Sequence, residues 1–589
     1  MGWEGWFTIA CVVLMFLLLI RTRIGPEFIV TGTLVLLLTV GILDPAEALV
    51  GLSNQGMVTV AVLFVVAAGI AGTGAIRFMA PFLTSRPRSL TWAQLRLMPP
   101  ITFMSAFLNN TPVVAIFIPA VATWAKKFNL PVSKLMIPLS YAAILGGTCT
   151  LIGTSTNLVV NGIMVEEAGQ ESLGFFEIAK VGFPCAIVMM LFMILVGRHL
   201  LPDRGSAVAQ FKDPKEYTVE MIVTPGEVLD GTTVERSGIK EVHGLYLVEV
   251  LRGGKALPVV DSTMRLEGED RLVFTGVVET VVDLQKLAGL TPVMDHIFQI
   301  ESPRFDRCLI EVVVSPSCRL IGRTIVGGHF RQIYNAVVVA ISRNGHQIKQ
   351  SIGDVVIRVG DTLLLESPPS FYTRHRNSKD FYLVSQLEET AAPRHGKAIL
   401  ASLILLAMVG LAASGIMGML NAAALAAAAL LLTGCLTTSQ AVRSIDWQVL
   451  FVIVSAFGIG KAMQVTGAAE VIATQLVGLV EGNPWLVLAV LYGVTSLMTE
   501  LVTNNAAALI LFPIAMSTAG QMDVSIQPFA IAIMLGASAS FATPIGYQTN
   551  MMVYGPGGYH FTDFLKIGVP MNILMLLTAS LLIPVMFPF

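Results

Sequence analysis

The sequence predicts a polytopic α-helical membrane protein, built from two repeats of opposite topology, that carries a soluble α+β insert. Composition is the first observation, because 54% of the 589 residues are hydrophobic and only 13% are charged. The distribution of charge is the second, since Ser206–His395 holds 45 of the 76 charged residues and the other 399 residues hold 31. The third is that the two apolar flanks share three motifs in the same order. Flanks of this composition are typical of membrane segments.

The composition also excludes several functional classes. The net charge of −2 provides no basic surface for nucleic acid. The six cysteines are scattered without a CxxC pair, so neither a disulfide framework nor a zinc site is predicted. No motif of the sequence brings together a nucleophile, a base and an orienting residue, and the sequence has no Walker-type phosphate loop. We therefore expect neither an enzyme nor an ATP-driven protein, and no tightly bound cofactor.

The uneven charge divides the chain into four parts. We predict a first membrane repeat over 1–205 and a second over 396–589, separated by soluble domains over 206–299 and 300–395. Each flank holds six apolar stretches long enough to cross or re-enter a bilayer, near 7–20, 25–43, 57–75, 99–121, 135–164 and 178–197 in the first and near 397–413, 416–435, 447–465, 485–517, 527–553 and 567–588 in the second.

Basic residues in the loops orient these stretches, because cytoplasmic loops are rich in Lys and Arg. If the insert is cytoplasmic and 99–121 is a re-entrant hairpin, all the basic loops of the first repeat lie inside and the acidic loops around Asp44 and Glu166 lie outside. A single crossing at 99–121 would divide the basic loops between both faces. We therefore predict hairpins near 99–121 and 485–517 and halves that begin on opposite faces. Such an inverted repeat is typical of secondary transporters.

The shared motifs contain residues that interrupt helices. FLNNTPVVAIFIPA from position 107 matches LVTNNAAALILFPIA from 501, and this aligns Asn110 with Asn504. CTLIGTSTN from 149 matches FATPIGYQTN from 541, and GFFEIAKVGFP from 174 matches HFTDFLKIGVP from 560. Asn, Gly, Pro and hydroxyl residues favour caps and turns over helix interiors. Unwound backbone at membrane depth is tolerated only where protein or a water-filled cavity satisfies it.

These interruptions predict a binding site. Half-helix N-termini that face each other can bind an anion through backbone N–H groups, and exposed carbonyl oxygens suit a small cation such as Na⁺. The alternative is that the small polar residues only pack helices together. The predicted anion site consists of Asn109, Asn110, Thr111, Ser155, Thr156, Asn157, Thr503, Asn504, Asn505, Gln548, Thr549 and Asn550.

The twin motifs Asn109-Asn110-Thr111 and Thr503-Asn504-Asn505 resemble the Ser-Asn-Thr signatures of the divalent anion:sodium symporters, in the ion-transporter superfamily. The resemblance covers both flanks and is closest to the sodium/sulfate symporter-type permeases. It implies a homodimer, an elevator mechanism, and one Na⁺ site at each hairpin motif with its neighbouring break. The Na⁺ residues would be Asn110, Gly153, Asn157, Asn504, Gly546 and Asn550. Asn109 and Thr503 depart from the signature, because the family often has Ser there.

The resemblance implies Na⁺-coupled uptake of a divalent oxyanion, and we expect sulfate. The hairpin tips carry no aligned Arg or Lys, and neutral amides and hydroxyls suit a compact tetrahedral anion. A C4-dicarboxylate is the alternative substrate. A gated ion channel is a less favoured function, because the sequence has neither a fourfold repeat nor a repeated filter loop.

The polar insert contains a second internal repeat. Residues 219–234 match 310–325, with Pro225 over Pro316, and β-branched runs alternate with Gly and Asn turns. The pattern resembles the TrkA-C domain. That resemblance implies a structural or dimerising role, or the binding of a nucleotide or another small regulator. We expect a multi-pass protein in contact with lipid in the plasma (inner) membrane of a prokaryote, with the insert in the cytoplasm.

Lys461 and Glu500 are charged residues in otherwise apolar stretches. Charges at such positions are costly and are often functional. Glu500 precedes the second hairpin motif, where it could tune a cation site, accept a proton, or only brace the hairpin. Lys461 is expected to extend its ammonium group to the outer interface.

Overall fold

A computed structural model divides the chain into two compact units. The helical unit comprises Met1–Asp203, Ala392–Val553 and His560–Phe589, and the insert unit comprises Arg204–Ala391 with Tyr554–Tyr559. The structure describes residues 2–22, 24–74, 87, 89–128, 130–203, 218–234, 236–237, 239, 245–253, 255–257, 264–276, 290–292, 308–315, 318–343, 346–348, 352–368, 371, 375, 378, 380–386 and 397–589.

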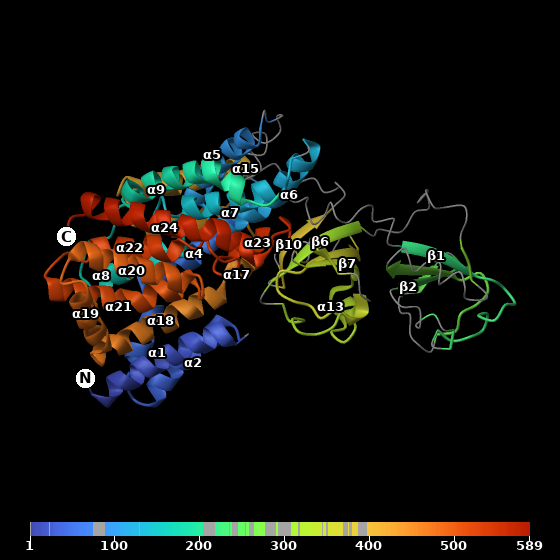
Figure 1. The fold of residues 1–589 in the computed structure, drawn as a ribbon, viewed down its shortest axis with the longest axis horizontal. Helices are drawn as coiled ribbons and strands as arrows, with labels where there is room; N and C mark the ends of the chain where they lie inside the picture. The colour runs from blue at the N-terminus through green and yellow to red at the C-terminus, as the bar shows by residue number, and fades with distance from the viewer. Residues whose placement is uncertain are drawn as a thin grey trace. The chain divides into compact units, whose positions relative to one another are not determined.

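The helical unit contains the two flanks of the sequence (Figure 1). The helices of the first flank are α1 Trp3–Arg21, α2 Pro26–Thr39, α3 Pro45–Ala48, α4 Gln55–Gly72, α5 Leu90–Phe107, α6 Asn110–Lys127, α7 Ser133–Gly147, α8 Ser155–Glu166, α9 Ala179–Phe192 and α10 Arg198–Leu200. Those of the second flank are α15 Ala398–Ala413, α16 Met419–Leu432, α17 Thr438–Ser444, α18 Trp447–Val465, α19 Ala468–Leu479, α20 Pro484–Thr499, α21 Asn504–Met522, α22 Gln527–Ser538, α23 Gln548–Tyr554 and α24 Phe561–Met586.

The two flanks repeat helix bounds as well as motifs. Helices α2 and α16 each have 14 residues and begin 393 positions apart. The short helix α3 begins with a capping box of Asp44 and Glu47, and α17 begins with one of Thr437 and Gln440 at the same offset. A capping box satisfies two backbone N–H groups that a helix start leaves free. The duplication therefore includes the ends of helices far from the shared motifs.

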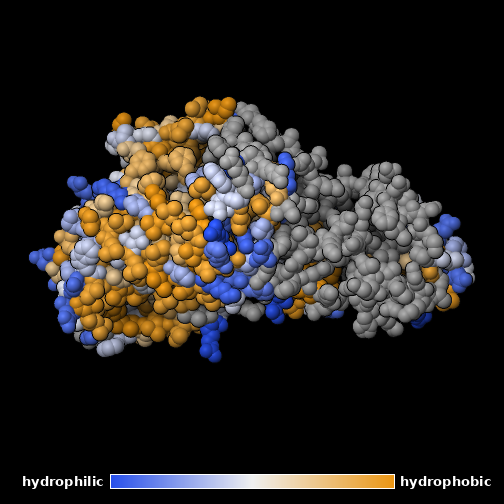
Figure 2. Space-filling model, turned by 45° about the horizontal axis from the view of Figure 1, so that its top comes forward, coloured by the Kyte–Doolittle hydropathy of each residue, from blue (hydrophilic) through white to orange (hydrophobic). Residues whose placement is uncertain are grey.

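The surface of the helical unit is strongly apolar. Among the described residues, five helices are long and apolar enough to cross a membrane, namely α4, α9 with its continuation to Leu200, α18, α21 and α24. Figure 2 shows hydrophobic residues spread over much of the visible, coloured face of the helical unit. Side chains such as Leu432, which is 88% exposed, point outward. An apolar surface of this extent is unusual on a soluble monomer and fits contact with lipid.

Each flank contains two interrupted helices. Helix α5 ends at Phe107 and α6 begins at Asn110, and α20 ends at Thr499 and α21 begins at Asn504. Residues 148–154 separate α7 from α8, and residues 539–547 separate α22 from α23. The predicted interruption of helices at the shared motifs is confirmed. The apolar stretches near 135–164 and 527–553 are accordingly two helices each.

The insert unit contains two antiparallel five-stranded sheets. One has the order β3-β2-β4-β1-β5 and the other the order β10-β6-β9-β7-β8. The strands are β1 Thr218–Val223, β2 Leu245–Arg252, β3 Lys255–Leu257, β4 Arg271–Gly276, β5 Leu290–Pro292, β6 Cys308–Val314, β7 Val337–Arg343, β8 His346–Gln347, β9 Thr362–Ser367 and β10 Phe381–Gln386. A short helix, α13 Phe330–Tyr334, accompanies the second sheet.

The same ion pair stabilises both sheets. Arg252 Nη2 lies 2.8 Å from Asp270 Oδ2, and Arg343 Nε lies 2.7 Å from Asp361 Oδ1, 91 positions further along the chain. Both aspartates are almost fully buried, and paired guanidinium and carboxylate groups of this geometry form strong hydrogen bonds. The equivalent pairs show that the two sheets are copies of one arrangement.

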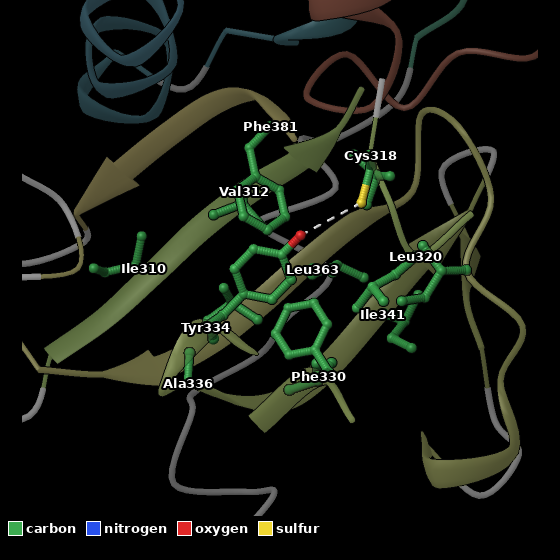
Figure 3. Close-up of a cluster of buried hydrophobic side chains, with 14 of the residues drawn as sticks. Ile310, Val312, Cys318, Leu320, Phe330, Tyr334, Ala336, Ile341, Leu363 and Phe381 are labelled. Carbon is green, nitrogen blue, oxygen red and sulfur yellow. Dashed lines mark hydrogen bonds between the residues drawn. The ribbon is translucent and has the colours of Figure 1, made fainter. Parts of the chain in front are cut away.

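Aromatic and aliphatic side chains fill the core of the second sheet. Phe330 and Tyr334 of α13 pack on Val312, Leu363 and Phe381 of the strands (Figure 3). The Tyr334 hydroxyl meets the thiol of Cys318 at 3.9 Å, so the polar end of this buried ring has a partner. The insert therefore has a hydrophobic core of its own.

Candidate functional site

The first hairpin motif and the break between α7 and α8 form one hydrogen-bonded network. Ser105 Oγ donates to Asn110 Oδ1 at 2.5 Å. The hydroxyl of Thr150, in the break, donates to the carbonyl of Ala106 and accepts from the Gly153 backbone N–H at 3.1 Å. Asn157 Nδ2 donates to the Thr150 carbonyl at 2.9 Å and to the Gly147 carbonyl at 3.2 Å. Side chains thus satisfy the backbone where the helices are interrupted.

The second motif and the break between α22 and α23 form an equivalent network. Thr499 Oγ1 donates to Asn504 Oδ1 at 2.9 Å. The Thr543 hydroxyl donates to the Glu500 carbonyl at 3.0 Å and accepts from the Gly546 N–H at 3.0 Å. Asn550 Nδ2 donates to the carbonyls of Ser540 and Thr543 at 2.9 and 3.1 Å. Every bond of the first network recurs at an offset of 393 or 394 residues.

Four pairs of side chains connect the two networks. Asn505 Oδ1 accepts from Thr156 Oγ1 at 2.9 Å, and its Nδ2 donates to Ser155 Oγ at 3.1 Å. Thr111 Oγ1 donates to Gln548 Oε1 at 2.9 Å. Asn110 Nδ2 donates to the Tyr547 hydroxyl at 2.6 Å. The predicted residues of both repeats therefore lie in one place.

The electrostatic character of this place is set by helix ends. Helices α6, α8 and α21 begin at Asn110, Ser155 and Asn504, and each has at least 12 residues. The first turn of a helix carries a partial positive charge and free N–H groups. The twelve predicted residues include no Lys, Arg or His, so positive potential here comes from backbone dipoles. Neutral donors at converging helix starts are suited to an anion.

Comparison with known proteins identifies the family. The model of the citrate transporter family matches residues 16–536 of the chain, which include the first network and the second hairpin motif. The chain belongs to the citrate transporter family. It is therefore a transporter and not an enzyme, and its apolar helices make it a multi-pass membrane protein.

Similar proteins extend over nearly the whole transporter. A protein of Chlamydomonas reinhardtii, named as a candidate regulator of the response to sulfur deprivation, is 36% identical over 94% of this chain and 97% of its own length. A transporter of Synechocystis is 33% identical over 94% of this chain and 92% of its own. Sodium/sulfate cotransporter 2 of Chlamydomonas reinhardtii is 26% identical and covers 99% of this chain and 90% of its own length.

Glu500 of the transporter is a buried brace of the second break. Its carboxylate accepts from the backbone N–H groups of Ala542 and Thr543, both at 2.8 Å, from Asn572 Nδ2 at 2.8 Å and from Ser540 Oγ at 3.3 Å. Four donors can compensate the cost of removing a carboxylate from water. The geometry matches the bracing role that was one of three sequence interpretations. Lys461, half-buried near the end of α18, belongs to neither network.

The predicted site residues differ in the hydrogen bonds that they make. Thr503 caps α21 by accepting from the Ala506 N–H, whereas the side chain of Asn109 makes no hydrogen bond to any other described residue. Gly153 and Gly546 offer backbone N–H groups to threonine hydroxyls. Thr549 accepts from Ser140 Oγ at 2.9 Å.

Several participating residues were not among the predicted site residues, and Tyr547, whose hydroxyl accepts from Asn110 Nδ2 at 2.6 Å, is one of them. Ser105 and Thr499 carry hydroxyls 394 positions apart, and extending the first alignment by a few residues toward the N-terminus would have found them. Thr150 and Thr543 lie inside the second motif, but their role depends on folded geometry. Ser140 lies within the uninterrupted helix α7, and no sequence signal distinguishes it from a packing residue.

Proposed function

We propose that the transporter couples the inward flow of Na⁺ to the uptake of a divalent oxyanion, most plainly sulfate. The observation that carries this proposal is the duplicated network, in which two interrupted helix pairs bring oxygen donors and helix starts together. Secondary transporters bind substrate and coupling ions at such discontinuous helices. The names of the sodium/sulfate cotransporter relatives, which match 99% of the chain, support the same ion and substrate.

The oxygen atoms of each network are suitable ligands for Na⁺. The first network gathers the oxygens of Asn110, Thr150 and Asn157 with the carbonyl of Gly147. Asn157 Oδ1 is buried and has no hydrogen-bond partner among the described residues. A buried acceptor without a partner costs about 1–3 kcal/mol, and a bound cation would remove that cost. Asn550 is the equivalent residue of the second network, where we place the second ion.

The substrate would lie where the two networks meet. Ser155, Thr156 and Asn505 form direct contacts there, beside the starts of α8 and α21. Hydroxyl and amide donors can surround a tetrahedral oxyanion, and two adjacent Na⁺ ions would balance its double charge. Uptake then requires both ions, because the anion alone would be a buried charge without compensation.

A carboxylate substrate is the second candidate, and the description of the family as citrate transporters favours it. Asn110 with Thr111 on one tip and Asn504 with Asn505 on the other could each hold one carboxylate. A dicarboxylate is longer than sulfate and would need the two tips further apart than the direct contacts between the networks permit.

The wider arrangement completes the proposal. The pairs α5–α6 and α20–α21 act as re-entrant hairpins of a mobile part in an elevator-type homodimer. The insert, with its two similar sheets, acts as a pair of TrkA-C domains in the cytoplasm that regulate transport through a nucleotide or another small ligand. The membrane is the plasma membrane of a prokaryote.

Uptake into proteoliposomes tests the function. Labelled sulfate should accumulate when Na⁺ is imposed outside, and selenate and molybdate should compete, because they share its shape and charge. Strong competition by succinate or citrate, without competition by selenate, would show that the substrate is a carboxylate and not sulfate. Equal uptake with K⁺ in place of Na⁺ would show that Na⁺ is not the coupling ion.

Matched variants test the site. Asn110→Ala and Asn504→Ala remove equivalent oxygens of the two networks, so each should raise the Na⁺ concentration for half-maximal uptake by about tenfold, which corresponds to one lost ligand of about 1.4 kcal/mol. Ser414→Ala is the control, because Ser414 is exposed and bonds only its own helix. An unchanged Na⁺ dependence in both Asn variants would place the ion elsewhere.

A further inference from the structure

An apolar pocket adjoins the candidate site on the side of Asn109. Its walls come from α4, from the tip between α5 and α6, from the start of α8 and from α15. Eleven of the thirteen lining residues are apolar, and Asn109 and Ser155 are the two polar ones. A pocket with a large apolar wall and few polar groups at one end selects a ligand with the same division.

The polar end of the pocket belongs to the anion site. Ser155 opens α8 and bonds Asn505 of the other repeat. The Asn109 amide makes no hydrogen bond to another described residue. The equivalent residue Thr503 accepts from the Ala506 N–H through its hydroxyl and so caps α21. The two repeats thus differ at this position, and the difference leaves a donor and an acceptor facing the pocket only in the first repeat.

The apolar wall is well defined. Phe107 stacks on Phe175 with ring centroids 6.4 Å apart and meets Phe176 edge-on at 6.3 Å, so its ring is held in place. Leu63 and Phe64 of α4 and Leu405 of α15 also line the pocket. These three side chains and that of Phe107 are partly exposed.

We propose that this pocket binds the apolar group of an amphipathic oxyanion, of the short alkyl sulfate type, whose charged head occupies the anion site at Asn109 and Ser155. The proposal rests on the proposed function, because the head group offers the same sulfate oxygens to that site, with one negative charge in place of two. Within the series of alkyl sulfates, binding then strengthens with chain length until the pocket is full.

Inhibition of labelled sulfate uptake by methyl, ethyl, propyl and butyl sulfate tests the pocket in proteoliposomes of the full chain. Each methylene that leaves water should lower the half-inhibitory concentration by about fourfold. Leu405→Trp fills the pocket and should abolish this trend while leaving sulfate uptake near the unmodified level. Leu406→Trp is the matched control, because the next residue on α15 is 65% exposed and lies outside the pocket, so the trend should persist.

A trend that is absent, or one that is equal in Leu405→Trp and Leu406→Trp, overturns the proposal, because partition into lipid would affect both variants alike. The thermal midpoint of the purified protein in nanodiscs gives a readout that needs no transport. Butyl sulfate should raise it more than methyl sulfate does in the unmodified protein and in Leu406→Trp, and not in Leu405→Trp. If sulfate is not taken up but this pattern holds, the proposed function fails and the pocket stands.

Discussion

Asn157 and Asn550 are equivalent residues with unequal surroundings. Both donate Nδ2 to two carbonyls of their own break, but Asn550 Oδ1 also accepts from Ser140 Oγ at 2.7 Å. Ile533 stands 393 positions after Ser140 and has no hydroxyl. The difference explains why Asn157 Oδ1 has no partner in the described part of the chain whereas Asn550 Oδ1 does.

Replacing Ser140 by Ala should therefore destabilise the second network. The variant leaves two buried acceptors, Thr549 Oγ1 and Asn550 Oδ1, without their donor, at a cost of about 1–3 kcal/mol. Thermal unfolding in detergent measures the loss, with Ser414→Ala as the exposed control. A midpoint equal to that of the control would show that the Ser140 bonds contribute nothing.

The carboxylate of Glu500 gives a second prediction at the scale of the residue. Glu500→Gln replaces one acceptor oxygen by an NH₂ group, which must then face the N–H of Ala542 or Thr543. We expect a loss of about 2–4 kcal/mol in unfolding free energy, since charge-assisted bonds to a buried group are removed. Glu470→Gln is the matched control. Stability unchanged by Glu500→Gln would mean that the Glu500 carboxylate does not brace the second break.

Sequence reasoning found residues where both repeats carry an unusual type, such as Asn110 and Asn504. It could not find Ser140 or Tyr547, because each makes its bonds to the opposite repeat. Contacts between repeats depend on how the two halves pack, which no local motif records.

Helix α8 illustrates how elements position the site. Gly162 on α8 lies so close to α4 that an added Cβ would be 2.6 Å from Asn54 Oδ1 and 3.0 Å from the Gly56 nitrogen. Glu166, at the end of α8, accepts from Asn54 Nδ2 at 2.7 Å and from the Gln55 N–H at 3.0 Å. The helix that begins with Ser155 is therefore fixed at its other end.

Gly162→Ala should displace α8 and with it the start of the helix at the site. We expect a loss of about 2–3 kcal/mol in stability from overpacking and a fall in uptake. Gly410→Ala is the matched control, because nothing lies within 4 Å of the position where its Cβ would be and Ala favours helix by about 1 kcal/mol. Equal effects of the two substitutions would contradict the close approach of α4 and α8.

Strand β6 gives a pH-dependent prediction for the insert. Burial raises the pKa of Glu311 to about 7, well above the usual value of a glutamate. The native state then binds more protons than the unfolded state between about pH 4.5 and 7, so stability falls as pH rises through that window and is level above it. The full change is about 3 kcal/mol for a shift of this size.

Hydrogen exchange of the β6 amides in the full chain, corrected for intrinsic rates, should show protection that decreases from pH 4.5 to 7. Glu311→Gln should remove this slope, whereas Glu227→Gln, at an exposed position, should preserve it. A slope that persists in Glu311→Gln would assign the pH dependence to another group.

Helix α19 shows the limit of sequence interpretation at the scale of the element. Residues Ala468–Leu479 form a helix, although Glu470, Thr474 and Gln475 interrupt the apolar run enough to hide it from a search for membrane stretches. The interruptions of α7–α8 and α22–α23 were visible, because Gly and Pro within apolar sequence have a direct conformational cause.

The topology of the whole molecule follows from the predicted orientation. Cysteines introduced at Lys127 and at Arg86, which lies outside the described residues, should react with a membrane-impermeant reagent only from the cytoplasm. Cysteines at Glu481 and Asp523 should react only from outside, because the predicted hairpins return to the side from which they enter. Labelling of either pair from opposite faces would show simple crossings.

The membrane character, the family and the position of the helix interruptions could be predicted from the sequence, because composition and an internal repeat indicate these properties directly. It could not supply the contacts of Asn505 with Ser155 and Thr156, which join residues about 350 positions apart. Such contacts are decided by the packing of whole repeats.

The equal lengths of α2 and α16, at equivalent positions of the two repeats, have an evolutionary consequence. A chain that arose by duplication began with two interchangeable halves, and each later substitution either kept that equality or ended it at one position. Ser140 aligns with Ile533, and Asn109 aligns with Thr503. At these two positions the repeats now carry side chains of different chemistry. Ile533→Ser would make the two copies alike at one such position.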